Sequence, residues 1–235
     1  MSQPRARAHE EVLRWAEEEM LSGRLTIGAR LPGERSLAAM LGVGRTSVRE
    51  AVRVLEAMGL VRTAVGSGPE SGSVVVARPD VAIGTALSMH LSTSYFPVAD
   101  IVRTRALLES WALESAAKDV DATQVARLAA MLDAMDDPRL SPDEFHRLDA
   151  EFHVALTELA GNVVITAIMT SLRVSIRGYV MYGVHALPDW QAMARRLRRE
   201  HRGILRAVES RKGDRAAQLV RRHIEGFHRA ATHDP

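Results

Sequence analysis

The sequence predicts a mainly α protein, with an N-terminal helix-turn-helix and β-hairpin followed by an all-α antiparallel helical bundle. Residues 28–62 read as two short helices around a glycine, and two β-rich runs follow them. From residue 81 onward the apolar residues repeat with helical spacing. A chain of 235 residues has room for two compact domains. We therefore expect domains at 1–77 and 81–235, joined by a linker at 78–80.

Three helices are expected in the first domain. A helix over residues 5–23 should pack under the helix-turn-helix. The next should run from about Glu34 to Leu41 and end at Gly42, because glycine adopts the left-handed conformation at little cost. A third helix should start near Arg45, since apolar residues recur there every three or four positions. These residues are Val48, Ala51, Val52, Leu55 and Met58.

The first turn of this third helix is predicted to present Arg45, Thr46, Ser47 and Arg49 outward. A short helix, a glycine turn and a second helix with an exposed cationic first turn are typical of a motif that enters the DNA major groove. Residues 24–62 contain seven Arg and three Glu, a net charge of +4, whereas the whole chain carries +2. The pattern therefore predicts DNA binding, and a plain helical hairpin with a solvated charged face is the alternative.

The same segment resembles the winged helix-turn-helix of the GntR regulators over some thirty positions. The matching residues are Leu31-Pro32-Gly33-Glu34-Arg35, Leu37-Ala38, Leu41-Gly42-Val43-Gly44-Arg45, Val48-Arg49-Glu50-Ala51, Leu55 and Gly59-Leu60. The resemblance implies that Arg35, Arg45 and Arg49 touch phosphates and guanine edges. It places Thr46 and Ser47 beside them. Arginine suits this role because its two-pronged head pairs with guanine O6 and N7.

A β-hairpin is expected after the third helix. The β-rich runs 61–65 and 73–76 lie on either side of a glycine- and serine-rich turn. By the resemblance this hairpin is the wing, whose tip usually carries a basic residue that reaches the minor groove. Here the tip has Glu70 instead, so we expect only the backbone at Gly66 to meet a phosphate.

The second domain should consist of seven helices, because no alternating run interrupts its helical pattern. The clearest start is at Ser141, where Pro142 and Glu144 complete a capping box. The expected helices are 81–92, 97–119, 121–136, 142–160, 162–184, 188–210 and 213–232.

Composition limits the classes of protein that the chain can represent. There is no cysteine, so disulfides are excluded and any metal site must use His and carboxylates. The first twenty residues lack the apolar stretch of a signal peptide, and no run is long enough to span a bilayer. We therefore expect a cytoplasmic protein that is nucleoid-associated when it is bound to DNA.

Polar side chains interrupt the apolar faces of four helices in the second domain. They are Arg105, Glu109, Asp149, His201 and His223, and His153 lies just beyond the apolar face of its helix, one turn after Asp149. Burying an unpaired charge is costly, so these groups must meet one another, a ligand or a metal. Three imidazoles and one carboxylate suit a divalent ion such as zinc, nickel or manganese. A single His on an apolar face is more often a hydrogen-bonded core residue, which is the alternative.

Residues 95–232 are similar to the ligand-binding FCD domain of the FadR-type GntR subfamily. The matching residues are Arg105 with Glu109, Asp149-Ala150-Glu151-Phe152-His153 with Gly161-Asn162, Glu200-His201, and His223. The resemblance implies a metal held by Asp149, His153, His201 and His223. It also implies that Arg105 clasps a small carboxylate effector beside the metal, an interaction that its fork geometry favours. A branch of the subfamily binds acyl-CoA without a metal, and the intact ligand set argues against that branch.

The sequence thus predicts a bacterial regulator of transcription, expected to be a repressor, that binds an inverted-repeat operator as a homodimer. Zinc is the expected ion. A metal-dependent hydrolase or oxygenase centre fused to a DNA-binding module is the alternative, and a structural metal is another. The spacing of Arg105 and Glu109 favours a pair, which disfavours Glu109 as a general base. The pattern does not fix which way the side chains of Arg173, Arg177 and Tyr179 face.

Overall fold

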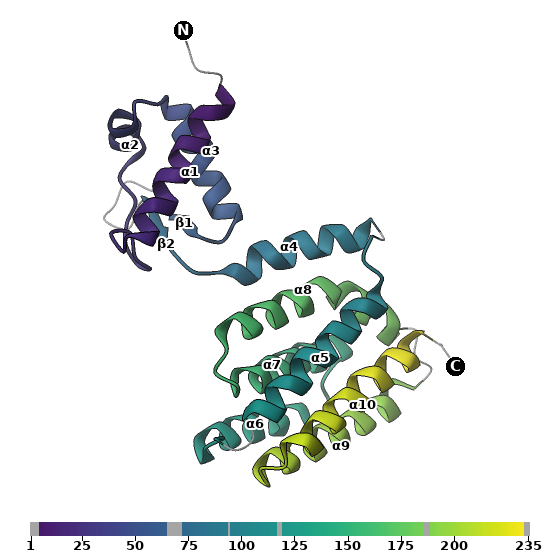
Figure 1. Cartoon of the computed structure of the whole chain (residues 1–235). Helices are drawn as coiled ribbons and strands as arrows, with labels where there is room; N and C mark the ends of the chain where they lie inside the picture. The colour runs from purple at the N-terminus through teal and green to yellow at the C-terminus, as the bar shows by residue number, and fades with distance from the viewer. Residues whose placement is uncertain (1–4, 65–71, 94, 117–118, 186–188, 233–235) are drawn as a thin grey trace. The chain divides into compact units, whose positions relative to one another are not determined.

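The computed structural model describes residues 5–64, 72–93, 95–116, 119–185 and 189–232. The chain divides into two compact units, Met1–Ile83 and Gly84–Pro235, coloured from purple to yellow along the chain in Figure 1. Among the described helices, none combines the length and apolarity needed to cross a bilayer.

The first unit contains the expected helix-turn-helix. Its elements are α1 (Arg5–Leu21), α2 (Glu34–Leu41), α3 (Arg45–Ala57), β1 (Val61–Ala64) and β2 (Gly72–Val75). Gly42 ends α2 in the left-handed conformation, at φ 66°, as predicted. Helices α1 and α2 both pack against α3 (Figure 1). Their contact is made by buried apolar residues, among them Val12, Leu37 and Val48.

The predicted hairpin is confirmed. Strand β1 pairs with β2 in antiparallel register, with Val61 opposite Val75. Both valines are buried, and they join Ala16 and Leu55 in an apolar cluster that fixes the hairpin to the helices. Gly66, expected to contact a phosphate through its backbone, lies outside the described residues.

The second unit is the expected helical bundle. It contains α5 (Val98–Ala116), α6 (Ala122–Met135), α7 (Pro142–Glu158), α8 (Val163–His185), α9 (Trp190–Glu209) and α10 (Gly213–Thr232). Helix α4 (Pro79–Ser92) precedes them and begins within the span expected as a linker. The capping box at Ser141 is confirmed, because its hydroxyl accepts a hydrogen bond from the Glu144 backbone N–H. A second capping box, formed by Asp121 and Gln124, starts α6.

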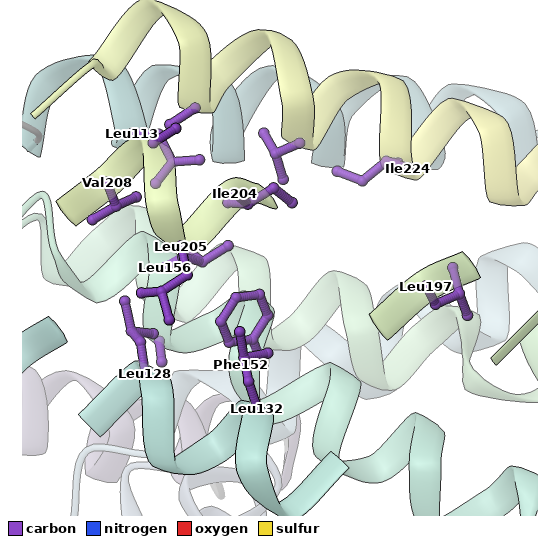
Figure 2. Packing of buried hydrophobic residues seen from close by; sticks show 14 of the residues in the cluster. Leu113, Leu128, Leu132, Phe152, Leu156, Leu197, Ile204, Leu205, Val208 and Ile224 are labelled. Atoms are coloured by element: carbon purple, nitrogen blue, oxygen red, sulfur yellow. The ribbon is translucent and has the colours of Figure 1, made fainter. Parts of the chain in front are cut away.

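A single apolar core joins five of these helices. Helix α10 runs along α5 and also contacts α9, while α7 contacts α5, α6 and α8 (Figure 1). Leu113, Leu132, Phe152 and Ile204 come from four different helices and point into this core (Figure 2). Fully burying side chains of this size contributes about 1.5–3 kcal/mol each. Three of the helices that supply the core, α7, α9 and α10, also carry Asp149, His153, His201 and His223, so core packing holds those polar residues in place.

Candidate functional site

The exposed side of the helix-turn-helix carries arginine. Arg35, Arg45, Thr46 and Arg49 are all exposed. Arg49 donates from Nε and Nη2 to the carboxylate of Glu34, at 3.3 and 3.0 Å. This hydrogen-bonded pair lowers the pKa of Glu34. The first turn of α3 therefore presents cations to solvent, and one of them is held by a partner on α2.

The prediction that Ser47 faces outward is wrong. Ser47 is only 7% exposed. It directly precedes the buried Val48 and lies one turn before the buried Ala51. At 100° per residue this places Ser47 on the inner side of α3, beside the apolar stripe. Its side chain packs within the unit.

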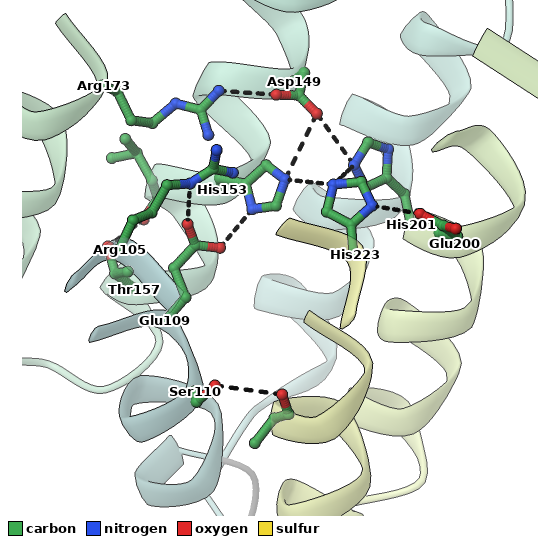
Figure 3. A network of polar contacts seen from close by, with 12 residues as sticks. Arg105, Glu109, Ser110, Asp149, His153, Thr157, Arg173, Glu200, His201 and His223 are labelled. Atoms are coloured by element: carbon green, nitrogen blue, oxygen red, sulfur yellow. Dashed lines mark hydrogen bonds and ion pairs between the residues drawn. The ribbon is translucent and has the colours of Figure 1, made fainter. Parts of the chain in front are cut away.

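Four polar side chains predicted as metal ligands converge inside the bundle (Figure 3). Asp149 and His153 come from α7, His201 from α9 and His223 from α10. All four are buried, and one ligand atom from each lies within 4.8 Å of the others. The His223 Nε2 atom lies 3.2 Å from His153 Nε2 and 3.1 Å from His201 Nε2. Asp149 Oδ1 lies 3.1 Å from His201 Nε2 and 3.5 Å from His153 Nε2.

Two carboxylates orient two of these imidazoles. Glu109 Oε2 lies 2.5 Å from His153 Nδ1, and Glu200 Oε2 lies 2.8 Å from His223 Nδ1. A charged carboxylate only accepts hydrogen bonds, so in both rings Nδ1 is the donor. The Nε2 atoms of neutral His153 and His223 then both carry lone pairs, although they lie 3.2 Å apart. Two facing lone pairs repel unless a positive charge lies between them.

The environment keeps the cluster in the protonation states that bind cations. Burial lowers the pKa of His201 and His223, because it disfavours the charged form of each ring. Burial alone would raise the pKa of Asp149, but its contacts with His153 and His201 and the charge of Arg173 hold that pKa well below its usual range. Metal ligands are neutral imidazoles and charged carboxylates, so both shifts favour coordination.

The spacing of the cluster also fits a divalent ion. Metal–nitrogen bonds of 2.0–2.1 Å in a tetrahedral site place neighbouring ligand atoms about 3.3 Å apart. The four separations given above, from 3.1 to 3.5 Å, lie close to that value, and all four ligand atoms lie within 4.8 Å of one another. The residues present therefore fit a divalent ion, which three Nε2 atoms and one carboxylate oxygen would hold.

Two arginines extend the cluster towards a cavity of about 560 Å³. Arg105 donates from Nε to Glu109 at 2.7 Å, the pair that the sequence predicted. Burial alone would raise the pKa of Glu109, but its contact with His153 and the charge of Arg105 outweigh that effect and lower the pKa to about 2. Arg173 on α8 donates from Nη2 to Asp149 Oδ2 at 2.8 Å. Arg105, Asp149, Arg173 and His223 all line the cavity.

Sequence reasoning missed part of this site. The sequence pattern did not single out His146, which packs against Phe145, Trp190 and Phe227 and also lines the cavity. Its position three residues before Asp149 was a signal that the two share a helix face. The sequence did not orient Arg173, and the side chains of Arg177 and Tyr179 lie outside the described residues.

Comparison with known proteins identifies both units. Residues 9–69 match the family described as bacterial regulatory proteins, gntR family, and residues 100–226 match the FCD domain. The transcriptional repressor NanR of Cronobacter sakazakii is 30% identical over 88% of this chain and 79% of its own length. The Glc operon transcriptional activator of Escherichia coli K12 is also 30% identical, over 88% of this chain and 82% of its own length.

A solved structure supports the same assignment. The Streptococcus agalactiae GntR structure superposes with a TM-score of 0.68 at 25% identity, covering 94% of this chain and 99% of that one. Fold and matches together define a bacterial regulator of transcription. The chain belongs to the GntR family, in its FadR-like, FCD-containing subfamily. This family and the relatives named above regulate transcription rather than catalyse reactions, so the expectation that the chain is not an enzyme is confirmed.

Proposed function

We propose that this regulator is a metal-dependent repressor that a small organic acid releases from its operator. The observation that carries the proposal is the convergence of Asp149, His153, His201 and His223 beside a cavity lined by Arg105. A divalent ion bound there supplies an electron-accepting centre for a carboxylate. Arg105 then binds the same carboxylate, and Glu109 holds Arg105 in place.

For DNA recognition we propose a homodimer in which each α3 enters a major groove. Arg35, Arg45, Thr46 and Arg49 are the residues proposed to contact DNA, because they are exposed on α2 and the first turn of α3. Arginine on a base edge contributes enough that each loss weakens binding about 10- to 100-fold. Sedimentation of the protein with and without DNA tests the homodimer, and a monomer on the operator would contradict it.

Fluorescence anisotropy with an operator selected from random duplexes tests the DNA contacts. Arg45→Ala and Arg49→Ala should weaken binding, whereas Arg14→Ala should not. Arg14 is a suitable control because it is an exposed arginine on α1 that pairs with Glu11. Unchanged affinity in both α3 variants would refute the role of this helix.

Metal analysis tests the second unit. His201→Ala and His223→Ala should lose the bound ion, while His90→Ala, which changes an exposed histidine on α4, should retain it. Full occupancy in both core variants would rule out this ligand set. Zinc is the ion that we expect, and the same measurement with nickel and manganese tests the two other candidates.

Regulation requires the acid to favour one conformation over another. A ligand changes DNA affinity only by its different affinity for the two states of the dimer. We propose that acid binding at Arg105 favours the state with low operator affinity. Adding acid to the metal-loaded complex should therefore release DNA. The Arg105→Gln variant should remain bound to the operator when the same acid is added. Release that does not depend on Arg105 would contradict this coupling.

A further inference from the structure

The cavity contains buried hydrogen-bonding atoms that the protein itself does not satisfy. Arg173 uses Nη2 for Asp149, but its Nε and Nη1 atoms are buried and have no partner among the described residues. The same is true of His146 Nε2. Both side chains line the 560 Å³ cavity. An unpaired buried donor costs about 1–3 kcal/mol, and more when the group is charged, so these atoms are placed for a ligand.

The charges around the cavity also indicate that a ligand binds there. Arg105 and Arg173 are positive, and Glu109 and Asp149 are negative, so the buried side chains cancel one another. A divalent ion on the histidine cluster then leaves two uncompensated positive charges. A ligand with one carboxylate neutralises only one of them, whereas a ligand with two carboxylates neutralises both. Buried charges are stable only when they are compensated.

We propose, on the basis of the proposed function, that the effector is a dicarboxylic acid whose second carboxylate is bound by Arg173. Its first carboxylate lies at the metal and Arg105. The Nε and Nη1 atoms of Arg173 carry three N–H donors that have no partner among the described residues, so donors are available for the second carboxylate. His146 Nε2 adds a further hydrogen bond inside the same cavity.

Other arginines around the cavity are poorer candidates for this role. Arg127 donates to Glu158 at 2.6 Å, and Arg147 donates to Glu151 at 2.7 Å. Both are largely exposed, with about 60% of each side chain accessible to solvent. Water screens such charges and satisfies their donors. Arg173 combines burial with free donors, and Arg147 therefore provides a matched control within the same cavity.

The size of the cavity allows an acid with two separated carboxylates. A cavity of about 560 Å³ lies within the range of roughly 300–1,000 Å³ that is typical of sites for small ligands. An acid of three to six carbons is small enough to enter and long enough to separate two charged ends.

Calorimetry and thermal-shift measurements on the zinc-loaded full chain test the proposal. Diacids of three to six carbons are each compared with the monoacid of the same carbon number, for example succinate with butyrate. At least one diacid should bind about 10- to 100-fold more tightly than its monoacid. Arg173→Gln should remove most of that difference, Arg173→Lys should retain part of it, and Arg147→Gln should leave it within about twofold.

The outcomes separate this inference from the proposed function. Equal binding of every diacid and its matched monoacid would overturn the second carboxylate while leaving a metal-bound acid intact. An equal loss of monoacid and diacid affinity in Arg173→Gln at full zinc occupancy would also overturn it. If no acid binds the zinc-loaded protein, both proposals fail. The wild-type comparison needs no substitution, so it decides the matter even if a variant does not fold.

Discussion

The two units use arginine–carboxylate pairs in opposite ways. In the first unit, Arg49 pairs with Glu34 at 3.0 Å, with 53% and 38% of the two side chains exposed. In the second, Arg105 pairs with Glu109 at 2.7 Å, with 9% and 0% exposed. The distances are similar, but the surroundings differ. An exposed pair contributes little because water competes for both partners, whereas a buried partner left alone is strongly destabilising.

The difference shows how each unit is suited to its ligand. A solvated arginine can leave its carboxylate for a phosphate or a base edge at little cost. Buried arginines cannot reorganise into water, so their charge stays aimed at the cavity and must be matched by what enters it. The exposed pair therefore allows Arg49 to exchange Glu34 for DNA. The buried cluster instead requires a ligand whose negative charge compensates the arginines.

The largest effect should follow from breaking the buried pair. Glu109→Gln removes the charge that compensates Arg105, which costs about 3–5 kcal/mol. In chelator, this should lower the melting temperature of the helical bundle by about 10 °C. Calorimetry of Glu34→Gln provides the comparison, with an expected shift of no more than about 2 °C. Equal shifts in the two variants would show that burial does not distinguish the pairs.

Metal affinity should depend next on the carboxylates behind the histidines. Glu109→Gln no longer fixes the Nδ1–H form of His153, so zinc affinity should fall about 10- to 100-fold. Glu200→Gln acts on His223 in the same way, but Glu200 is 30% exposed and the loss should lie at the lower end of that range. Competition titration with a chelating dye measures both. A larger loss in Glu200→Gln would reverse the order that burial predicts.

Much of the fold could be predicted from local sequence patterns. The helix ends at Gly42 and Ser141 depend on residues within one turn, which is why both predictions are confirmed. The burial of polar residues could also be predicted, because Glu109 and His201 interrupt apolar stripes that a helix must bury. In each case the deciding interaction lies within a single helix.

The predictions that failed or stayed open depend on contacts between helices. Ser47 was predicted to face outward, yet it is buried beside the apolar stripe of α3. Arg173 lies on α8, whose apolar pattern does not distinguish a side facing solvent from a side facing Asp149 on α7. Glu200 was seen only as a motif residue, because its partner His223 is 23 positions away. The residues proposed to bind metal, effector and DNA remain predictions for the experiments above.

A pH dependence should follow from His146. Burial lowers its pKa to about 4, so the folded protein keeps it neutral while the unfolded chain takes up a proton below about pH 6.5. The unfolded state then binds more protons, and stability falls as the pH drops from 6.5 towards 4. Between pH 7 and 5 the wild type should lose about 2 kcal/mol more than His146→Gln. Urea unfolding in chelator at both pH values measures this, and parallel losses would place His146 in contact with water.

The smallest effect should come from breaking the exposed pair of Arg49 and Glu34. It should change the preference for operator over other DNA rather than the stability of the protein. Glu34 holds the Arg49 guanidinium through two hydrogen bonds and places a negative charge beside the surface proposed to meet phosphates. Glu34→Gln weakens that hold and removes the repulsion. Affinity for non-operator DNA should therefore rise by a few-fold, and the salt dependence should steepen by about one phosphate contact. Operator affinity should change less, so the ratio of specific to non-specific binding falls.

Anisotropy titrations with operator and scrambled duplexes at several salt concentrations measure this ratio. Glu11→Gln is the matched control, because Glu11 also pairs with an exposed arginine but lies on α1, which carries none of the residues proposed to contact DNA. It removes the same charge from the same unit, so any effect of net charge alone appears in both variants. A local effect appears only in Glu34→Gln. If both variants raise non-specific binding equally, Glu34 contributes through total charge and does not position Arg49.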